Sequence, residues 1–293
     1  MNTSDGKTEK HEIVNCFSVD VEGFVESNLE SIIVDKEYIS QAKERYEIEK
    51  NINETLEFLA ELSIKATFFY LGRIGRDMPD LVRKTAEQGH EIACHSNEHL
   101  RIYGQSREDF KAGLDYAKKI LEDCSGNEVC GFRAPDFSIT KDSLWALDIL
   151  KEAGFKYDSS ICPTGVHDVY GIEDANPYIH KLSNGLIEFP VSTINIFGKR
   201  VPFGGGGYFR LYPLFLSRYF ASRVNREGHP CMLYMHPYEI GPVIPGINGI
   251  SAYRKFRHYY NCNKGSKRLR KIFQGHNFDT AVKILTERRF LTT

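Results

Sequence analysis

Two histidines four positions apart, His95 and His99, are the residues of this chain whose types and spacing are best suited to chemistry. They follow residues 89–94, an apolar run typical of a short buried strand. If the segment after that strand is helical, the two imidazoles share one face. Such a pair is half of a metal site, which still needs a carboxylate or a third histidine. Alone it is weak evidence, because a single histidine is more often a hydrogen-bonded structural residue.

The carboxylates that complete this chemistry lie far upstream, in Asp20 and Glu22. They end a mostly apolar run over residues 12–19 that predicts a first buried strand. Side chains two apart on a strand share a face, so both carboxylates are expected to face one cavity. The same residues also fit a simpler interpretation, a strand that ends in a polar turn, because Asp and Gly favour turns.

The composition limits the class of protein. The 293 residues are 41% hydrophobic, which is enough for the large core of a single α/β barrel. A net charge of −1 gives no general attraction to nucleic acid. Seven cysteines without a Cys-x-x-Cys pair indicate reduced thiols. Residues 1–10 lack a signal-peptide core, so we expect a soluble, cytoplasmic protein that does not bind nucleic acid.

Strands and helices are expected to alternate along the chain, as in a parallel α/β fold. The predicted strands cover residues 66–71, 90–94, 129–132, 155–160, 187–191 and 230–236, and the predicted helices cover 51–62, 78–88, 108–124, 140–153 and 213–226. The glycine-rich stretch 203–210 predicts a flexible loop that a ligand can approach closely. The basic residues of the tail, 251–293, favour a solvated helix face, with an anionic lipid or phosphate as the alternative partner.

We predict one domain over residues 1–293, with a core over about 12–241 and a helical, basic C-terminal extension over about 242–293. Seven candidate site residues share one kind of position, since each falls at or just after the carboxyl end of a predicted strand. They are Asp20, Glu22, His95, His99, Arg133, Asp158 and His236. In a parallel barrel those ends surround one mouth, where active sites are built.

Five short motifs resemble, in order, those of the polysaccharide deacetylases of carbohydrate esterase family 4. They are Asp20-Val-Glu22, His95-Ser-x-x-His99, Arg133-Ala-Pro, Asp158-Ser-Ser and Leu233-Tyr-Met-His236-Pro. The stretch ending in Tyr208-Phe-Arg210 and residues 253–259 resemble the branch associated with exosortase and exopolysaccharide gene clusters. The resemblance spans roughly residues 13–291. It implies the family's α/β fold, a distorted (β/α)7-type barrel.

The resemblance also implies a metal site and its catalytic partners. His95 and His99 would ligate a divalent metal, usually zinc, and Asp20 would be the general base. Arg133 would hold Asp20, and His236 would be the acid that protonates the leaving amine. The family's first motif has adjacent aspartates, whereas Val21 separates the two acids here; by strand alternation we assign Glu22 as the third ligand.

Further residues are assigned to supporting and substrate-binding roles. Asp158 matches the acid that supports the Arg or His, Leu233 matches a residue that lines the acetyl pocket, and the backbone N–H of Asp136 matches the oxyanion donor. We also expect Tyr208 and Arg210 to bind substrate.

The function implied is a metal-dependent hydrolase that removes an N-acetyl group from an aminosugar, in a polysaccharide or in its lipid-linked or oligosaccharide precursor. The basic tail would then meet either the pyrophosphate of such a precursor or an anionic membrane surface. One alternative is a metal-independent amide hydrolase of the same superfamily, similar to the allantoinases. The other is a catalytically inactive, sugar-binding barrel, although a binding protein has no need for base, acid, Arg and two His together.

Overall fold

The computed structural model describes residues 12–24, 41–166, 170–244, 246 and 251–292. Its central strand is β1 (Val14–Val21), which pairs along its length with three other strands. β11 (Asn277–Asp279) pairs with the start of β1, β10 (Met232–Met235) with its middle, and β2 (Thr67–Tyr70) with its carboxyl half. The start and the end of the chain therefore meet in one sheet.

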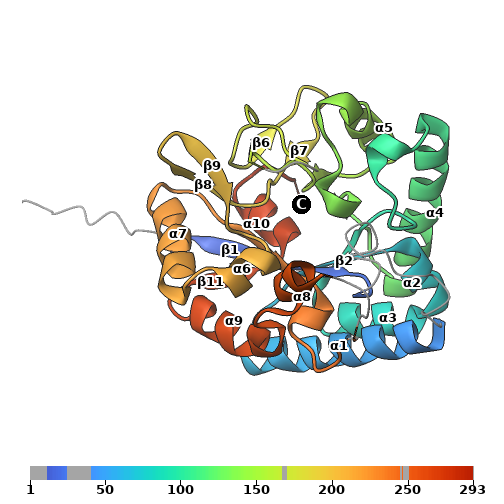
Figure 1. Ribbon diagram of the computed structural model, residues 1–293. Helices are drawn as coiled ribbons and strands as arrows, with labels where there is room; N and C mark the ends of the chain where they lie inside the picture. The colour runs from blue at the N-terminus through green and yellow to red at the C-terminus, as the bar shows by residue number, and fades with distance from the viewer. Residues whose placement is uncertain (1–11, 25–40, 167–169, 245, 247–250, 293) are drawn as a thin grey trace, which may run out of the picture.

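The remaining strands extend the sheet from β2. They are β3 (Glu91–Cys94), β4 (Gly131–Phe132), β5 (Tyr157–Asp158), β7 (Ile187–Glu188) and β6 (His180–Lys181), of which only β6 runs antiparallel to its neighbour. A separate hairpin pairs β8 (Thr193–Ile196) with β9 (Lys199–Pro202). The expected parallel α/β barrel is confirmed, since Figure 1 shows the sheet curled with helices around its outside.

The helices lie outside the curled sheet, except α10 (Ala281–Glu287), whose Ala281, Ile284 and Leu285 pack in one interior cluster with Cys16 and Phe69. They are α1 (Gln41–Glu61), α2 (Gly72–Asp77), α3 (Pro79–Glu87), α4 (Arg107–Ser125), α5 (Ala146–Glu152), α6 (Gly206–Leu211), α7 (Leu214–Arg226), α8 (Ala252–Tyr259), α9 (Gly265–Phe273) and α10 (Ala281–Glu287), with short 3₁₀ turns at 102–104, 135–137, 141–143, 237–239 and 262–264. Local sequence explains the ends of α4, since the Ser106 hydroxyl accepts a hydrogen bond from the Asp109 N–H and Gly126 ends the helix at φ 70°. Among the described residues, no helix has the length and apolarity needed to cross a bilayer.

Strand alternation divides the core into two faces. Phe17, Val19 and Leu233 pack outward against the helices, whereas Cys16, Phe69 and Met232 pack toward the barrel interior. On β1 the interior series continues through Ser18 and Asp20 to Glu22. One face of a single strand thus carries both acids to the mouth.

Three elements differ from the sequence-based expectations. No helix follows β3 directly, because residues 95–101 are irregular chain with a bend at 97–99. The glycine-rich stretch, expected as a loop, contains α6 because Gly206 and Gly207 start a helix. The C-terminal extension is not only helical, because it supplies β11 to the central sheet.

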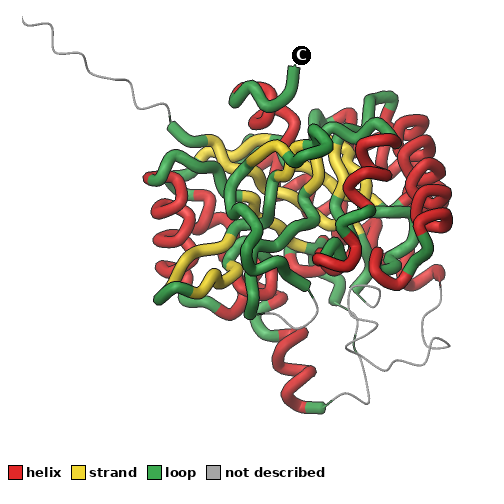
Figure 2. Tube along the Cα trace, turned by 90° about the horizontal axis from the view of Figure 1, so that it is seen from above, coloured by secondary structure: helices red, strands yellow, loops and turns green. Residues whose placement is uncertain are grey.

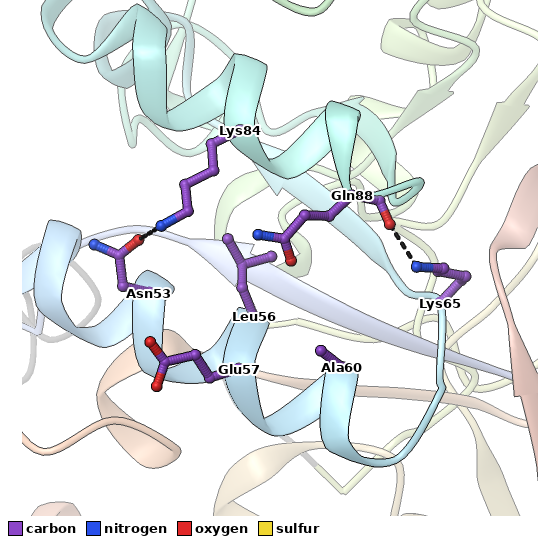
Figure 3. A pocket seen from close by; sticks show the side chains of 7 residues that line it. All are labelled: Asn53, Leu56, Glu57, Ala60, Lys65, Lys84 and Gln88. Carbon is purple, nitrogen blue, oxygen red and sulfur yellow. Dashed lines mark hydrogen bonds between the residues drawn. The ribbon is translucent and has the colours of Figure 1, made fainter.

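A groove of about 440 Å³ lies between α1 and α3 on the outside of the barrel (Figure 3). Both lysines that line it donate hydrogen bonds, Lys84 Nζ to Asn53 Oδ1 at 2.6 Å and Lys65 Nζ to the backbone carbonyl oxygen of Gln88 at 2.5 Å. None of the sequence-predicted site residues lines this groove. The chemistry belongs to the mouth of the barrel instead.

Candidate metal and catalytic site

Glu22, His95 and His99 converge at the mouth, and one ligand atom from each lies within 4.8 Å of the other two. Glu22 Oε2 contacts His99 Nε2 and lies 3.7 Å from His95 Nε2. All three side chains are buried. These are the three residues that the sequence analysis assigned as metal ligands, although the two histidines do not meet along a helix face as expected.

The two imidazoles meet through a tight bend and not along a helix face. Ser96 adopts φ 71°, in the left-handed region, and reverses the chain directly after His95. The carbonyl oxygens of Ser96 and Asn97 accept hydrogen bonds from the backbone N–H groups of Gly72 and Arg73, which fixes the bend against the start of α2. As a result the rings of His95 and His99 lie 5.6 Å apart.

The protonation pattern of this cluster suits a cation. His95 Nδ1 lies 2.8 Å from the carbonyl oxygen of Arg133. A carbonyl can only accept, so Nδ1 carries the hydrogen and the Nε2 lone pair faces Glu22. Glu22 Oε2 is buried and accepts no hydrogen bond of normal geometry from the described residues. A buried carboxylate oxygen facing two imidazole nitrogens fits a divalent metal, and zinc prefers this donor set.

Asp20 is held by Arg133, as the resemblance implied. Arg133 Nη1 lies 2.6 Å from Asp20 Oδ1, and both side chains are buried. The guanidinium also donates to Ser18 Oγ at 2.8 Å and to Ser159 Oγ at 2.9 Å, and it lies 4.1 Å from the centre of the Phe69 ring. These contacts fix the guanidinium against the Asp20 carboxylate.

His236 lies between two carboxylates. Its Nε2 is 3.0 Å from Glu22 Oε1, and its Nδ1 is 3.0 Å from Glu239 Oε2. Burial alone would lower the pKa of His236, but the hydrogen bonds to Glu22 and Glu239 raise it well above its usual value. Burial raises the pKa of Glu22, but the imidazoles of His99, His236 and His95 lower it well below its usual range.

Glu239 is the site residue that sequence reasoning missed. It is fully buried, and its Oε1 lies 2.5 Å from Arg210 Nε. Burial raises the pKa of Glu239, but Arg210 and then His236 lower it to about 2. The signal in the sequence was the position of Glu239 three residues after His236, with Pro237 between them. A 3₁₀ turn there brings the carboxylate back to the imidazole, and the His236 N–H donates to Glu239 Oε2 at 3.0 Å.

Arg210, predicted to bind substrate, has a structural role instead. Its guanidinium is buried against Glu239 and donates to the carbonyl oxygens of His258 and Tyr260 at 3.0 and 3.1 Å. Arg210 therefore links the C-terminal segment to Glu239, the residue that supports His236. It is not directed at a substrate.

Leu233 is the second correction. It lies on the outward face of β10, packed in the core beneath the helices, so it does not line an interior pocket. Alternation places Tyr234 on the interior face with His236, and the Tyr234 ring lies 5.3 Å from the Arg133 guanidinium and 5.0 Å from the Phe137 ring. Burial is the main cause that raises the pKa of Tyr234, and the half-buried Tyr208 adds to it. Tyr234 therefore takes the place expected for Leu233.

Asp158 is the third correction, because it supports neither Arg133 nor His236 directly. Its carboxylate accepts from Ser160 Oγ at 2.5 Å, and Ser160 Oγ accepts in turn from the Ala134 N–H at 2.8 Å. Within the described part of the chain, no hydrogen bond joins Asp158 to either residue. Asp158 positions the backbone of the Arg133-Ala-Pro segment.

That segment ends in two strained residues. Asp136 and Phe137 have φ values of 52° and 51°, a conformation that costs about 1–3 kcal/mol per residue outside glycine. The Asp136 side chain is tied to Arg101 Nε at 2.8 Å. Strain of this kind persists where the surrounding structure enforces it, which is common next to reacting groups.

Each half of the chain resembles a known protein family. Residues 34–157 match the family described as polysaccharide deacetylase, and residues 159–286 match a domain of unknown function, DUF3473. A chitooligosaccharide deacetylase of Sinorhizobium fredii is 34% identical over 98 residues, which are 33% of this chain and 43% of that protein. The chain thus matches less than half the length of this relative.

Two solved structures share the fold. A crystal structure from Mycobacterium smegmatis, described as a polysaccharide deacetylase, has a TM-score of 0.62 at 19% identity and covers 94% of this chain and 89% of its own. The Puue allantoinase has a TM-score of 0.59 at 16% identity and covers 96% and 92%. Residues 34–157 thus resemble the polysaccharide deacetylase family and residues 159–286 resemble DUF3473, while the two solved structures show that the fold is shared.

Proposed function

We propose that this protein is a metal-dependent hydrolase that removes the N-acetyl group from an aminosugar in a polysaccharide or in its lipid-linked or oligosaccharide precursor. The observation that carries the proposal is the buried cluster of Glu22, His95 and His99 directly beside His236. The matched relatives include proteins named chitooligosaccharide deacetylase and peptidoglycan-N-acetylglucosamine deacetylase, which supports the substrate class. The cytoplasmic location stays a prediction, and it makes an intracellular precursor the first substrate to test.

Glu22, His95 and His99 would hold the metal, which when bound polarises the amide carbonyl and lowers the pKa of water. Asp20, held in place by Arg133, accepts the proton of the attacking water. His236 donates a proton from Nε2 to the leaving amine while Glu239 holds Nδ1. The Asp136 N–H is assigned to the developing oxyanion.

The rival function is a metal-independent amide hydrolase. The observation that favours it is the 3.0 Å contact between His236 Nε2 and Glu22 Oε1, which would allow this pair to act without a metal. The likeness to the allantoinase extends to the fold alone. Metal content separates the two functions.

The test is metal analysis of purified protein by mass spectrometry, with Glu22→Ala, His95→Ala and, as the matched control, His180→Ala, which lies outside the cluster. We expect about one zinc or similar ion per chain in wild type and control, and less than about a tenth of that in the two site variants. Release of acetate from N-acetylglucosamine oligomers should fall with the metal and return on adding it. Wild-type protein that holds no metal after reconstitution, or site variants that keep it, would contradict the proposal.

A further inference from the structure

The charge of this chain is strongly uneven. Residues 206–276 contain twelve Lys and Arg but only two acidic residues, Glu227 and Glu239, giving a net charge of +10, whereas the whole chain has −1. This segment forms α6 to α9, the orange and red quarter of the barrel in Figure 1. A near-neutral protein therefore presents one basic side.

Within that quarter, α8 stands out from the mouth of the barrel, as the helix at the lower edge of Figure 2. Its inner side is anchored, because His258 is buried and Arg210 binds the carbonyl oxygens of His258 and Tyr260. Its outer side carries Phe256 and Tyr260, which are 53% and 39% exposed with ring centres 4.8 Å apart. Two aromatic rings thus project together beside the candidate site.

Further exposed side chains lie at the same end of the barrel. α7 and α9 run antiparallel to the strands that follow them, β10 and β11, so both helices begin at the mouth of the barrel. Phe215, which is 69% exposed, lies at the start of α7, and the exposed Lys264 and Lys267 lie at the start of α9. Lys255 is exposed on α8 itself. None of the three lysines forms an ion pair with a described residue. We call Phe215, Phe256, Tyr260, Lys255, Lys264 and Lys267 the rim surface.

We propose that the rim surface docks the mouth of the barrel onto a membrane rich in anionic phospholipid. Exposed aromatic rings and exposed lysines at one end of the barrel match the two layers of a bilayer interface, since rings enter the acyl boundary while ammonium groups meet lipid phosphates. A nucleic acid would use the positive charge but gives less reason for an exposed phenyl ring beside a tyrosine. The proposal is independent of the proposed deacetylation, because it concerns where the mouth is held.

Vesicle co-sedimentation of the full chain tests this. One set of vesicles contains phosphatidylcholine alone, and the other contains 30% phosphatidylglycerol as well. The variants are Lys255→Gln/Lys264→Gln/Lys267→Gln and Phe256→Ser/Tyr260→Ser. The matched controls are Lys50→Gln/Lys119→Gln/Lys151→Gln, an equal charge change on exposed lysines elsewhere, and Phe197→Ser, an exposed aromatic on the β8–β9 hairpin. Because all substituted side chains are exposed, thermal unfolding should stay unchanged and serves as the folding check.

We expect wild-type protein to sediment with the anionic vesicles only, and 0.5 M salt to release it. The rim lysine triple should lower partitioning roughly a hundredfold and the aromatic pair roughly tenfold, while both controls bind as wild type does. Equal sedimentation with both vesicle types, or an equal loss in the control triple, would overturn the proposal. So would full vesicle binding by the aromatic variant combined with tight binding of duplex DNA by wild type, which would indicate a general polyanion surface.

Discussion

Glu239 is held on three sides, by Arg210, by the His236 ring and by the His236 N–H. A buried carboxylate costs several kcal/mol in lost hydration unless such partners compensate for it. This arrangement does two things for His236. It fixes the ring so that Nε2 points to Glu22, and it stabilises the protonated imidazole that an acid catalyst needs.

We therefore predict that Glu239→Gln lowers kcat for deacetylation roughly 10–100-fold with little change in KM. The loss of the negative charge lowers the pKa of His236. Because the acid form of His236 is required, the alkaline limb of the pH–activity profile should move to lower pH. The pH profile and thermal unfolding of the variant check this, with Glu227→Gln, an exposed acid of the same chain segment, as the matched control. An unshifted alkaline limb would show that Glu239 is only a structural residue.

For single residues, the alternation of side chains along a regular strand predicted which of them share a face. Asp20 and Glu22 share a face as expected. The same rule should have favoured Tyr234 over Leu233, since Tyr234 and not Leu233 is two residues from His236. Glu239 and Ser159 were not predictable in this way, because turns and a neighbouring strand bring them to the site.

Among the elements, the stretch from Gly204 to Gly207 shows why glycine was needed. The expected reason was the approach of a ligand, but the structure shows the approach of the chain itself. A Cβ on Gly205 would lie 2.7 Å from the Tyr234 hydroxyl oxygen, and one on Gly206 would lie 1.9 Å from Glu239 Oε2. The glycines let α6 start directly against the side chains that support the site.

Gly206→Ala should consequently displace Glu239. We expect a destabilisation of about 1–3 kcal/mol and a fall in kcat similar to that of Glu239→Gln. Gly207→Ala is the matched control, because its Cβ would meet nothing closer than Arg210 Nη2 at 4.0 Å and alanine favours a helix. Urea unfolding and kinetics of both variants measure the difference. Equal behaviour of the two would rule out the close packing of Gly206 on Glu239 as the cause.

Element prediction was most accurate where buried strands and long amphipathic helices repeat a simple period, as in β1, β2 and α4. It was wrong at the bend after His95, where the left-handed Ser96 depends on contacts with α2 that no local pattern encodes. It also started α1 too late, at Asn51. This residue lies inside the helix and binds the backbone of Val243, 192 positions away in the sequence.

Across the whole molecule, the two matched regions do not form separate units. β1 precedes both matched regions in the sequence. It pairs with β2 from residues 34–157 and with β10 and β11 from residues 159–286. The final helix, α10, also binds the first half, since the Ala281 N–H donates to Thr67 Oγ1 at 2.8 Å. The candidate site is likewise shared, because His95 and Arg133 come from one region and His236 and Glu239 from the other.

This arrangement predicts that neither half folds alone. The piece 1–158 would expose the edge of β1 that β10 covers, and the piece 159–293 would leave β10 and β11 without the strand that pairs with them. We expect no cooperative thermal transition from either piece and recovery of one when the two are expressed together. Near-UV circular dichroism and metal content of the co-expressed pair, compared with the intact chain, measure this recovery. A cooperative transition in the isolated second piece would mean that DUF3473 is a domain in its own right, and that β1 joins two structures able to stand apart.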